Sequence, residues 1–159
     1  MTELTGYLRS DGRKGIRNRI AVAYLVECAH HVARQIAAID PEGAHVIGFP
    51  GCFPNDYAQR VMERLCTHPN VGAVLLVSLG CESFDRYGLE QAVRASGRPV
   101  RVLTIQSDGG TRASIASGRD WVARMLNPKP LKSGDKLKMS FDMSQAHLFE
   151  AESGRSLRK

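Results

Sequence analysis

The stretch RIAVAYLVECAHHVARQIAAIDPEG, residues 19–43, combines two hydrophobic periods in one short unit. Arg19 to Val26 is a run of β-branched and apolar residues, which is typical of a strand buried on both faces. Cys28 to Ile39 then places apolar residues at helical spacing, and the turn residues 40–43 close the unit. The stretch therefore predicts a strand, a helix and a turn in series.

The same order of patterns follows three more times along the chain. The further strands are predicted at His45–Phe49, Ala73–Leu79 and Val100–Gln106, and the helices that follow them at Asn55–Leu65, Asp85–Ala95 and Thr111–Leu126. Asn55 can cap the first of these helices. Strand–helix units in series require a parallel sheet with right-handed crossovers. We therefore expect an α/β fold: a three-layer, Rossmann-like or flavodoxin-like domain with about four parallel strands and helices on both faces.

The chain divides near a proline pair. Asn127-Pro128-Lys129-Pro130 ends the last predicted helix, and the residues beyond it alternate between apolar and polar without a helical period. We predict an α/β domain over residues 1–127 and a β-rich tail over residues 128–159.

Composition and charge limit the possible functions. The 159 residues carry a formal net charge of +6, but Met1–Ile20 accounts for +3 and Leu131–Lys159 for +2. Because the excess lies at the two ends, aromatic residues make up only 6%, and no nucleic-acid-binding module is recognisable, we do not expect nucleic-acid binding. No apolar run approaches the roughly 20 residues that span a bilayer, so membrane insertion is not expected either.

Cysteine usage favours a reducing compartment. The four cysteines have no short C-x-x-C spacing, and the chain begins without a charged-then-apolar secretory start. We expect free thiols and a cytoplasmic protein. Cys28, Cys52 and Cys81 each follow a predicted strand, which places them at the carboxyl edge of a parallel sheet, where ligands bind in such folds. They are candidate metal ligands, with a nucleophile or a small buried side chain as the alternatives.

Other residues at the same edge are candidates for chemistry or binding. Glu82 is the best-placed carboxylate for acid or base work, and His30 lies on the first turn of a helix, although a solvated carboxylate and a surface histidine are the simpler explanations. Gly109 and Gly110 lead into a helix that Thr111 can cap, a pattern that suits an anion as well as an ordinary tight turn. Near the amino end, Arg13 and Arg17 are candidates to clamp a carboxylate. The candidate substrate-binding residues are Arg13, Arg17, Asn18, Gln106, Gly109, Gly110 and Thr111.

Several unusual motifs together resemble the core domain of the altronate/galactarate dehydratase family. They are GYLRSDGRKGIRN, the cysteine after the first strand, GCFPN, THPNVGAVLLVSLGCE and TIQSDGGT, and the match runs from about Gly6 to Leu126. The resemblance implies loss of water from a sugar acid to give a 2-keto acid, assisted by a divalent metal, typically iron. Glu82 or His30 would be the base, and the anionic sugar acid would be the substrate.

The chain also departs from that family. Members carry a small preceding SAF-like domain, in some cases as a separate subunit, and a further α/β segment, so partner portions of a dehydratase are expected here. The tail GDKLKMSFDMSQAHLFEAESGRSL resembles the TOBE element of sugar-transporter ATPases. A non-catalytic sugar-acid-binding or regulatory module is therefore the alternative function. A small sheet with exposed edges also favours a homo-oligomer.

Overall fold

The computed structural model describes residues 6–126, and its centre is a parallel sheet of four strands. In that range the sheet order is β4-β3-β5-β6, and every neighbouring pair is parallel. The strands are β3 (Arg19–Tyr24), β4 (Ala44–Gly48), β5 (Val71–Ser78) and β6 (Val100–Thr104). The predicted strand order along the chain and the parallel α/β class are confirmed.

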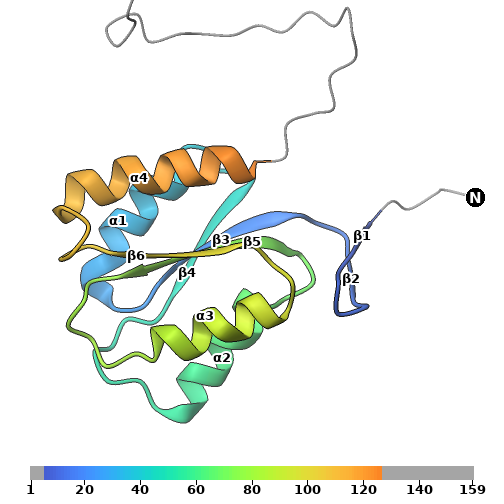
Figure 1. Ribbon diagram of the computed structural model, residues 1–159, viewed down its shortest axis with the longest axis horizontal. Coiled ribbons are helices and arrows are strands. Elements are labelled where there is room, and N and C mark those ends of the chain that lie inside the picture. The colour runs from blue at the N-terminus through green and yellow to red at the C-terminus, as the bar shows by residue number, and fades with distance from the viewer. Residues whose placement is uncertain (1–5, 127–159) are drawn as a thin grey trace, which may run out of the picture. The chain divides into compact units, whose positions relative to one another are not determined.

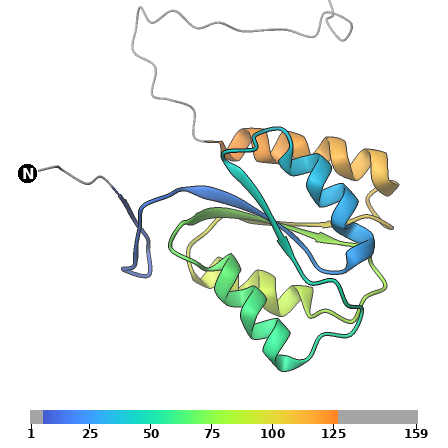
Figure 2. The same ribbon diagram turned by 180° about the vertical axis from the view of Figure 1, so that it is seen from behind.

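Helices cover both faces of the sheet (Figure 1). Helices α1 and α4 pack together on one face, and α2 and α3 lie on the other, as the view from behind also shows (Figure 2). The helices are α1 (Glu27–Ala37), α2 (Asp56–Cys66), α3 (Arg86–Ala95) and α4 (Gly110–Met125). The predicted three-layer arrangement is therefore confirmed.

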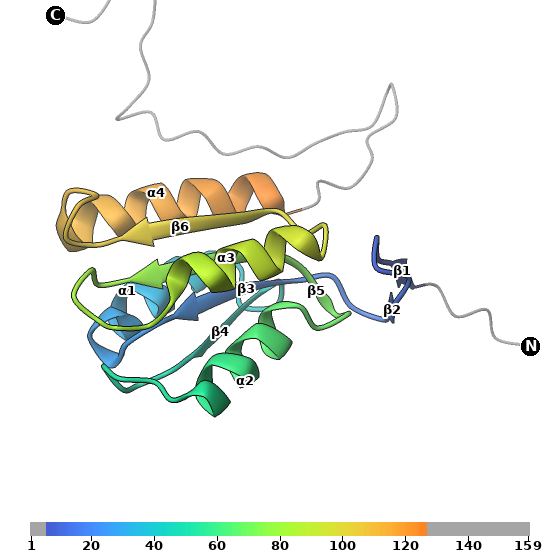
Figure 3. The same cartoon turned by 60° about the horizontal axis from the view of Figure 1, so that its bottom comes forward.

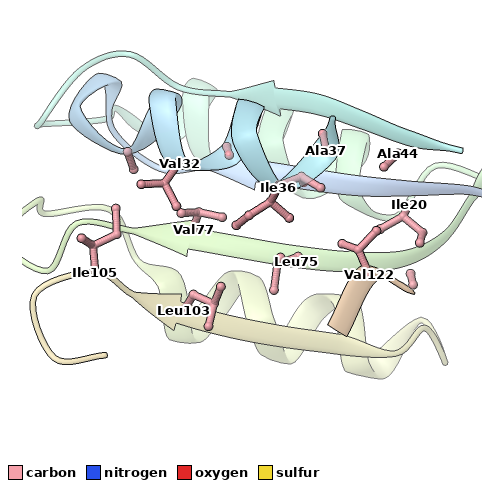
Figure 4. Packing of buried hydrophobic residues seen from close by; sticks show 14 of the residues in the cluster. Ile20, Val32, Ile36, Ala37, Ala44, Leu75, Val77, Leu103, Ile105 and Val122 are labelled. Carbon is pink, nitrogen blue, oxygen red and sulfur yellow. The ribbon is translucent and has the colours of Figure 1, made fainter. Parts of the chain in front are cut away.

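The alternation of side chains along each strand explains the two layers of core. Ile20 and Val22 of β3 pack toward α1 and α4, whereas Ala21 and Ala23 belong to the cluster beneath α2 and α3. Figure 4 shows Ile36 of α1 directed onto the first of these faces. Because both faces of the strands are covered, the strands are apolar along their whole length rather than at alternate positions.

The predicted helix starts are partly correct. Asn55 caps α2 by accepting a hydrogen bond of 2.9 Å from the amide of Ala58, as expected. The expected cap at Thr111 is wrong, because α4 begins at Gly110 and its N-cap is Gly109, with φ of 84°. Gly110 also has a positive φ, of 80°. Two successive left-handed residues make the turn tight enough to start the helix before Thr111.

A two-stranded antiparallel hairpin precedes the sheet and was not predicted. It consists of β1 (Tyr7–Leu8) and β2 (Lys14–Gly15). Gly15 is buried, and a side chain there would collide with the backbone carbonyl of Pro69. The Arg9 guanidinium donates to that same carbonyl at 2.7 Å. Glycine and arginine in this stretch therefore fix the hairpin to the loop before β5.

The predicted tail, residues 128–159, lies outside the described residues, so its β-rich character and the domain boundary stay predictions. Among residues 6–126, no helix is long and apolar enough to cross a membrane. The cytoplasmic location likewise stays a prediction.

Candidate functional site

The direction in which the chain adds strands reverses between the two central strands, β3 and β5. From β3 the chain passes to β4 on one side, then crosses back to β5 on the other side of β3. The helices that follow β3 and β5, α1 and α3, therefore lie on opposite faces of the sheet (Figure 1). In open α/β sheets ligands bind at such a switch point, at the carboxyl ends of the strands. His30, on the first turn of α1, and Glu82, in the loop after β5, lie on the two segments that flank it.

Backbone hydrogen bonds join the loops at this edge into one rim. The amide of Glu27 donates to Pro50 at 3.2 Å, and the amide of Ser83 donates to the carbonyl of Cys52 at 3.0 Å. The amide of Gln106 donates to Leu79 at 3.1 Å. The loops after all four strands are thus connected in pairs, so the rim is a continuous surface. The rim consists of the segments 27–30, 50–53, 79–83 and 104–111.

Glu82 is held inside the rim with both carboxylate oxygens occupied. The Ser78 hydroxyl donates to Oε1 at 2.5 Å, and the Gly80 amide donates to Oε2 at 2.8 Å. The Arg86 guanidinium in turn donates to the Ser78 hydroxyl at 3.3 Å. Glu82 is only 8% exposed. The side chain is therefore a buried, bonded carboxylate, not the solvated charge that was the simpler alternative.

The surroundings of Glu82 keep it ionised. Burial by itself raises the pKa of its carboxyl, but the hydrogen bonds from Ser78, from the Gly80 amide and from its own amide outweigh burial, and the positive charge of Arg86 acts in the same direction. The net pKa lies below its usual value. At neutral pH Glu82 is thus a carboxylate and cannot donate a proton as a general acid.

His30 has the surroundings of an oriented base. Its Nδ1 lies 3.0 Å from Oε1 of Glu27, and its ring stacks on Tyr24 with centroids 4.7 Å apart and an interplanar angle of 26°. A carboxylate at Nδ1 fixes the ring and favours the tautomer in which Nε2 can accept a proton. The His30 side chain is about one-third exposed, so part of the ring is accessible to a ligand.

The cysteines of the rim are accessible, and they do not form a metal centre on their own. Cys28, Cys52 and Cys81 are exposed, whereas Cys66 is buried. Within residues 6–126, no group of three His, Cys, Asp or Glu side chains is placed to hold a metal ion. The candidate metal ligands share one edge of the sheet, as predicted, but these residues do not make a ligand set.

The turn before α4 closes the rim beside the β5 loop. The Asp108 carboxylate accepts a bond of 2.8 Å from the amide of Thr104, and the amide of Gly110 donates to Ile105 at 2.9 Å. The Gln106 side chain lies against Gly80, where any side chain would collide with its amide oxygen. No side chain caps α4 at its N-cap, Gly109. The partial positive charge at this helix end thus faces the rim without a side-chain acceptor there.

Three candidate substrate-binding residues, Arg13, Arg17 and Asn18, lie away from the rim. Arg13 donates to the carbonyl of Thr67 at 2.7 Å, the backbone amide of Arg17 donates to Asn70, and the Asn18 amide oxygen accepts from Arg9. All of these contacts lie at the amino ends of the strands, and Figure 3 shows the hairpin at that end, away from the arrowheads. One copy of the chain therefore does not bring Arg13, Arg17 and Asn18 to the rim. A strand of five to eight residues separates the two ends.

The sequence interpretation missed the residues that support Glu82 and His30. Ser78 and Arg86 hold Glu82, while Glu27 and Tyr24 orient His30. One signal was available: Ser78 is a polar residue at the end of an otherwise apolar strand. Such a residue, when buried, needs a hydrogen-bonding partner.

Taken together, the fold and the rim define a doubly wound α/β domain whose candidate site lies at the carboxyl edge of the sheet. A family model for the second domain of D-galactarate dehydratase/altronate hydrolase matches residues 6–128. The chain belongs to this family.

The chain is also similar to a curated enzyme, the altronate dehydratase of Escherichia coli (strain K12). The two are 30% identical over 95 residues, which cover 51% of this chain and 19% of that enzyme. The chain thus spans about a fifth of the relative's length. The resemblance of the tail to a transporter element receives no support from either match.

Proposed function

We propose that this chain is a component of a sugar-acid hydro-lyase, and that its rim binds the substrate. The observation that carries the proposal is the placement of His30, on the first turn of α1, and Glu82, in the loop after β5, on the two segments that flank the switch point, in a domain of the dehydratase family. The reaction would remove a proton beside the carboxylate and a hydroxyl from the neighbouring carbon, and the resulting enol would become a 2-keto acid.

In this proposal His30 is the base. Its Nδ1 is held by Glu27, so Nε2 takes the α-proton and the imidazolium that forms is stabilised by the same carboxylate. Glu82 has a different role, because both of its oxygens are already bonded. It holds the loop after β5 in place and keeps a negative charge in the rim.

The turn before α4 is the proposed site for the substrate carboxylate. Gly109 and Gly110 leave the backbone open to close approach, and the uncapped helix end favours an anion. Gln106 lies at the same turn and can donate a hydrogen bond from its amide. Arg13, Arg17 and Asn18 would reach this site only from another copy of the chain.

A divalent metal, iron in the prediction, would stabilise the enediolate that forms when the proton leaves. The described residues do not provide a ligand set. Under this proposal Cys28, Cys52 or Cys81 supplies at most part of one, and the remaining ligands come from other portions of the dehydratase.

The alternative is a sugar-acid-binding or regulatory module that does not turn the ligand over. The specific observation in its favour is that both oxygens of Glu82, one of the two candidate bases, are already hydrogen-bonded by neighbouring groups. Both proposals require the rim to bind a sugar acid, and they differ only in turnover.

Binding is tested by thermal unfolding of the full chain in the presence of a panel of aldonates and aldarates. A ligand that binds the folded state raises the unfolding temperature. Thr111→Glu puts a carboxylate at the proposed anion site and should abolish the shift. Ala116→Glu makes the same change further along α4, at another exposed position, and should retain it. No shift with any sugar acid, or an equal shift in both variants, would rule out binding at this turn.

Turnover is tested separately. The chain, with ferrous iron and with the preceding and following dehydratase portions added as separate chains, is assayed for a 2-keto product. His30→Gln should remove the activity while leaving the thermal shift in place. Retained binding without product under all conditions would favour the binding module.

A further inference from the structure

A groove of about 390 Å³ lies near the amino ends of β3 and β5. It is lined by the start of β3, by residues of β4, by Leu65 in the last turn of α2 and by the loop before β5. Its volume is within the roughly 300–1,000 Å³ that small-molecule sites occupy. None of its lining residues belongs to the rim. The groove is therefore a second candidate site, separate from the one used in the proposed function.

The ionisable side chains that line the groove are all basic. They are Arg17, Arg19, His45 and His68, and no aspartate or glutamate lies among the lining residues. Within residues 6–126, neither of the two arginines forms an ion pair with a carboxylate. A cleft lined by charge of one sign concentrates ions of the other sign. The groove thus favours an anionic ligand.

His68 adds a hydrogen-bond donor to this lining. The backbone amide of Asn70 donates to its Nδ1 at 3.1 Å. A ring nitrogen that accepts a hydrogen bond carries no proton, so the proton of the neutral ring lies on Nε2. The Asn70 side chain also accepts from the amides of Ile16 and Arg17, at 2.9 and 3.3 Å. The loop that carries His68 and the segment that carries Arg17 are therefore fixed to each other.

The rest of the lining gives the groove an apolar wall. Ala21 of β3 pairs with His45 of β4, and since alternate residues of a strand point to the same side, Ile47 shares the face of His45. Leu65 of α2 and Val71 of β5 line the groove as well. One ligand can thus contact basic groups and apolar side chains at the same time.

We propose that this groove binds a small carboxylate with an apolar body, aromatic or aliphatic. A guanidinium group holds a carboxylate through two parallel hydrogen bonds, which Arg19 or Arg17 can supply. The hydrocarbon part of the ligand then covers Ile47 and Leu65 and removes their apolar surface from water. A sugar acid does not suit this wall, because its hydroxyls would face apolar side chains without hydrogen-bonding partners. The ligand class therefore differs from the one proposed for the rim.

Benzoate is the probe for this site, because two related compounds each lack one of its features. Benzamide keeps the ring without the charge, and acetate keeps the carboxylate without the ring. An NMR titration of the full chain at constant ionic strength gives each dissociation constant. Benzoate should bind about tenfold or more tightly than benzamide, acetate or inorganic phosphate. No binding of benzoate, or equal binding of any of the other three compounds, would overturn the proposal.

Two matched variants test the role of the arginines. Arg19→Gln should raise the dissociation constant of benzoate by about tenfold or more, through loss of a charge-assisted hydrogen bond. Arg34→Gln removes the same charge from an exposed position on α1, which packs on the other face of the sheet, and should leave the dissociation constant unchanged. Equal effects of the two substitutions would contradict the proposal.

The location of the ligand is tested in the wild type, so the result does not depend on whether a variant folds. Benzoate should shift the ring signals of His45 and His68 and leave those of His30, at the rim, unchanged. Thr111→Glu, which alters the rim, should bind benzoate as the wild type does. Shifts confined to His30, or loss of benzoate binding in Thr111→Glu, would place the ligand at the rim and overturn the inference. Neither result would affect the test of the proposed function with sugar acids.

Discussion

Ser78 is a buried hydroxyl whose position gives it two partners at once. It donates to Glu82 and accepts from Arg86, so it links an arginine of α3 to a carboxylate in the rim. Ser114 is also completely buried, yet among residues 6–126 its hydroxyl has no partner. The two serines are equally buried, but the Ser78 hydroxyl stabilises the folded state through its hydrogen bonds, whereas the Ser114 hydroxyl does not.

This contrast leads to a paired prediction. Ser78→Ala should lower the free energy of unfolding by about 1–3 kcal/mol, because a hydrogen bond to a charged group is lost inside the protein. Ser114→Ala should be neutral or slightly stabilising, since it removes a buried polar atom without a partner. Urea denaturation measures both. Equal losses in the two variants would show that burial alone, not the bond to Glu82, decides the cost.

The four cysteines should divide by reactivity. Burial raises the pKa of the Cys66 thiol to about 12, and its side chain is fully covered, whereas Cys28, Cys52 and Cys81 are exposed. Since the thiolate is the nucleophile, Cys66 should stay unlabelled by an alkylating reagent in the native protein while the other three react. Mass spectrometry with and without denaturant gives the number of alkylated cysteines. Rapid native labelling of Cys66 would contradict the packing of α2.

At the scale of elements, the contact between α1 and α4 depends on a glycine. Gly118 is buried, and a side chain there would collide with Ile36 of α1 and crowd Leu103 of β6. The absence of a side chain thus lets α4 approach α1 closely above the sheet. Figure 4 shows Ile36, Leu103 and Val122 in the layer that this approach seals.

A side chain added at Gly118 should destabilise the folded protein. Gly118→Val should lower the free energy of unfolding by about 1–3 kcal/mol through overpacking. Ala116→Val adds similar bulk at an exposed position of the same helix and should change stability by about 0.5 kcal/mol or less. Thermal or urea unfolding distinguishes them. A well-tolerated valine at 118 would mean that α4 shifts on the sheet without loss.

At the scale of the whole molecule, the hairpin is tied to the sheet through Asp11. Its carboxylate lies 2.7 Å from the guanidinium of Arg13 and 3.3 Å from that of Arg98, which is buried. Arg98 also donates to the carbonyl of Val71 at the start of β5. The hydrogen bonds from Arg13, helped by Arg98, hold the pKa of Asp11 well below its usual range.

The lowered pKa of Asp11 determines in which direction the stability of the folded protein changes with pH. Because the pKa of Asp11 is lower in the folded than in the unfolded state, its stabilisation is present above the ordinary value of 3.8 and is lost as pH falls toward the folded value. Acid should therefore destabilise the protein, and Asp11→Asn should make its stability depend less steeply on pH. Glu82 contributes with the same sign, so some slope should remain. Urea midpoints from about pH 6 down to about pH 2 test this; an unchanged slope in Asp11→Asn would contradict it.

The sequence by itself determined the strands and helices, because the period of its apolar residues indicates which segments form each. The runs at Arg19–Val26 and Ala73–Leu79 differ from β3 and β5 by at most two residues at either end. Local turn chemistry also identified Asn55 as a cap. These features depend on neighbours in the chain, which a sequence displays directly.

Only the tertiary structure decided which candidates share a site. Strand order placed His30 and Glu82 on the two sides of the switch point and left Arg13, Arg17 and Asn18 at the opposite ends of the strands. The pairing of Glu82 with Ser78 and Arg86, and the close approach at Gly15 and Gly118, likewise depend on contacts between elements. Motifs and composition show which residue types are present. The distance between residues that are far apart in the sequence depends on how the strands are ordered and how closely the helices pack. For that reason the sequence indicated the rim, and the packing of the folded chain determined which residues form it.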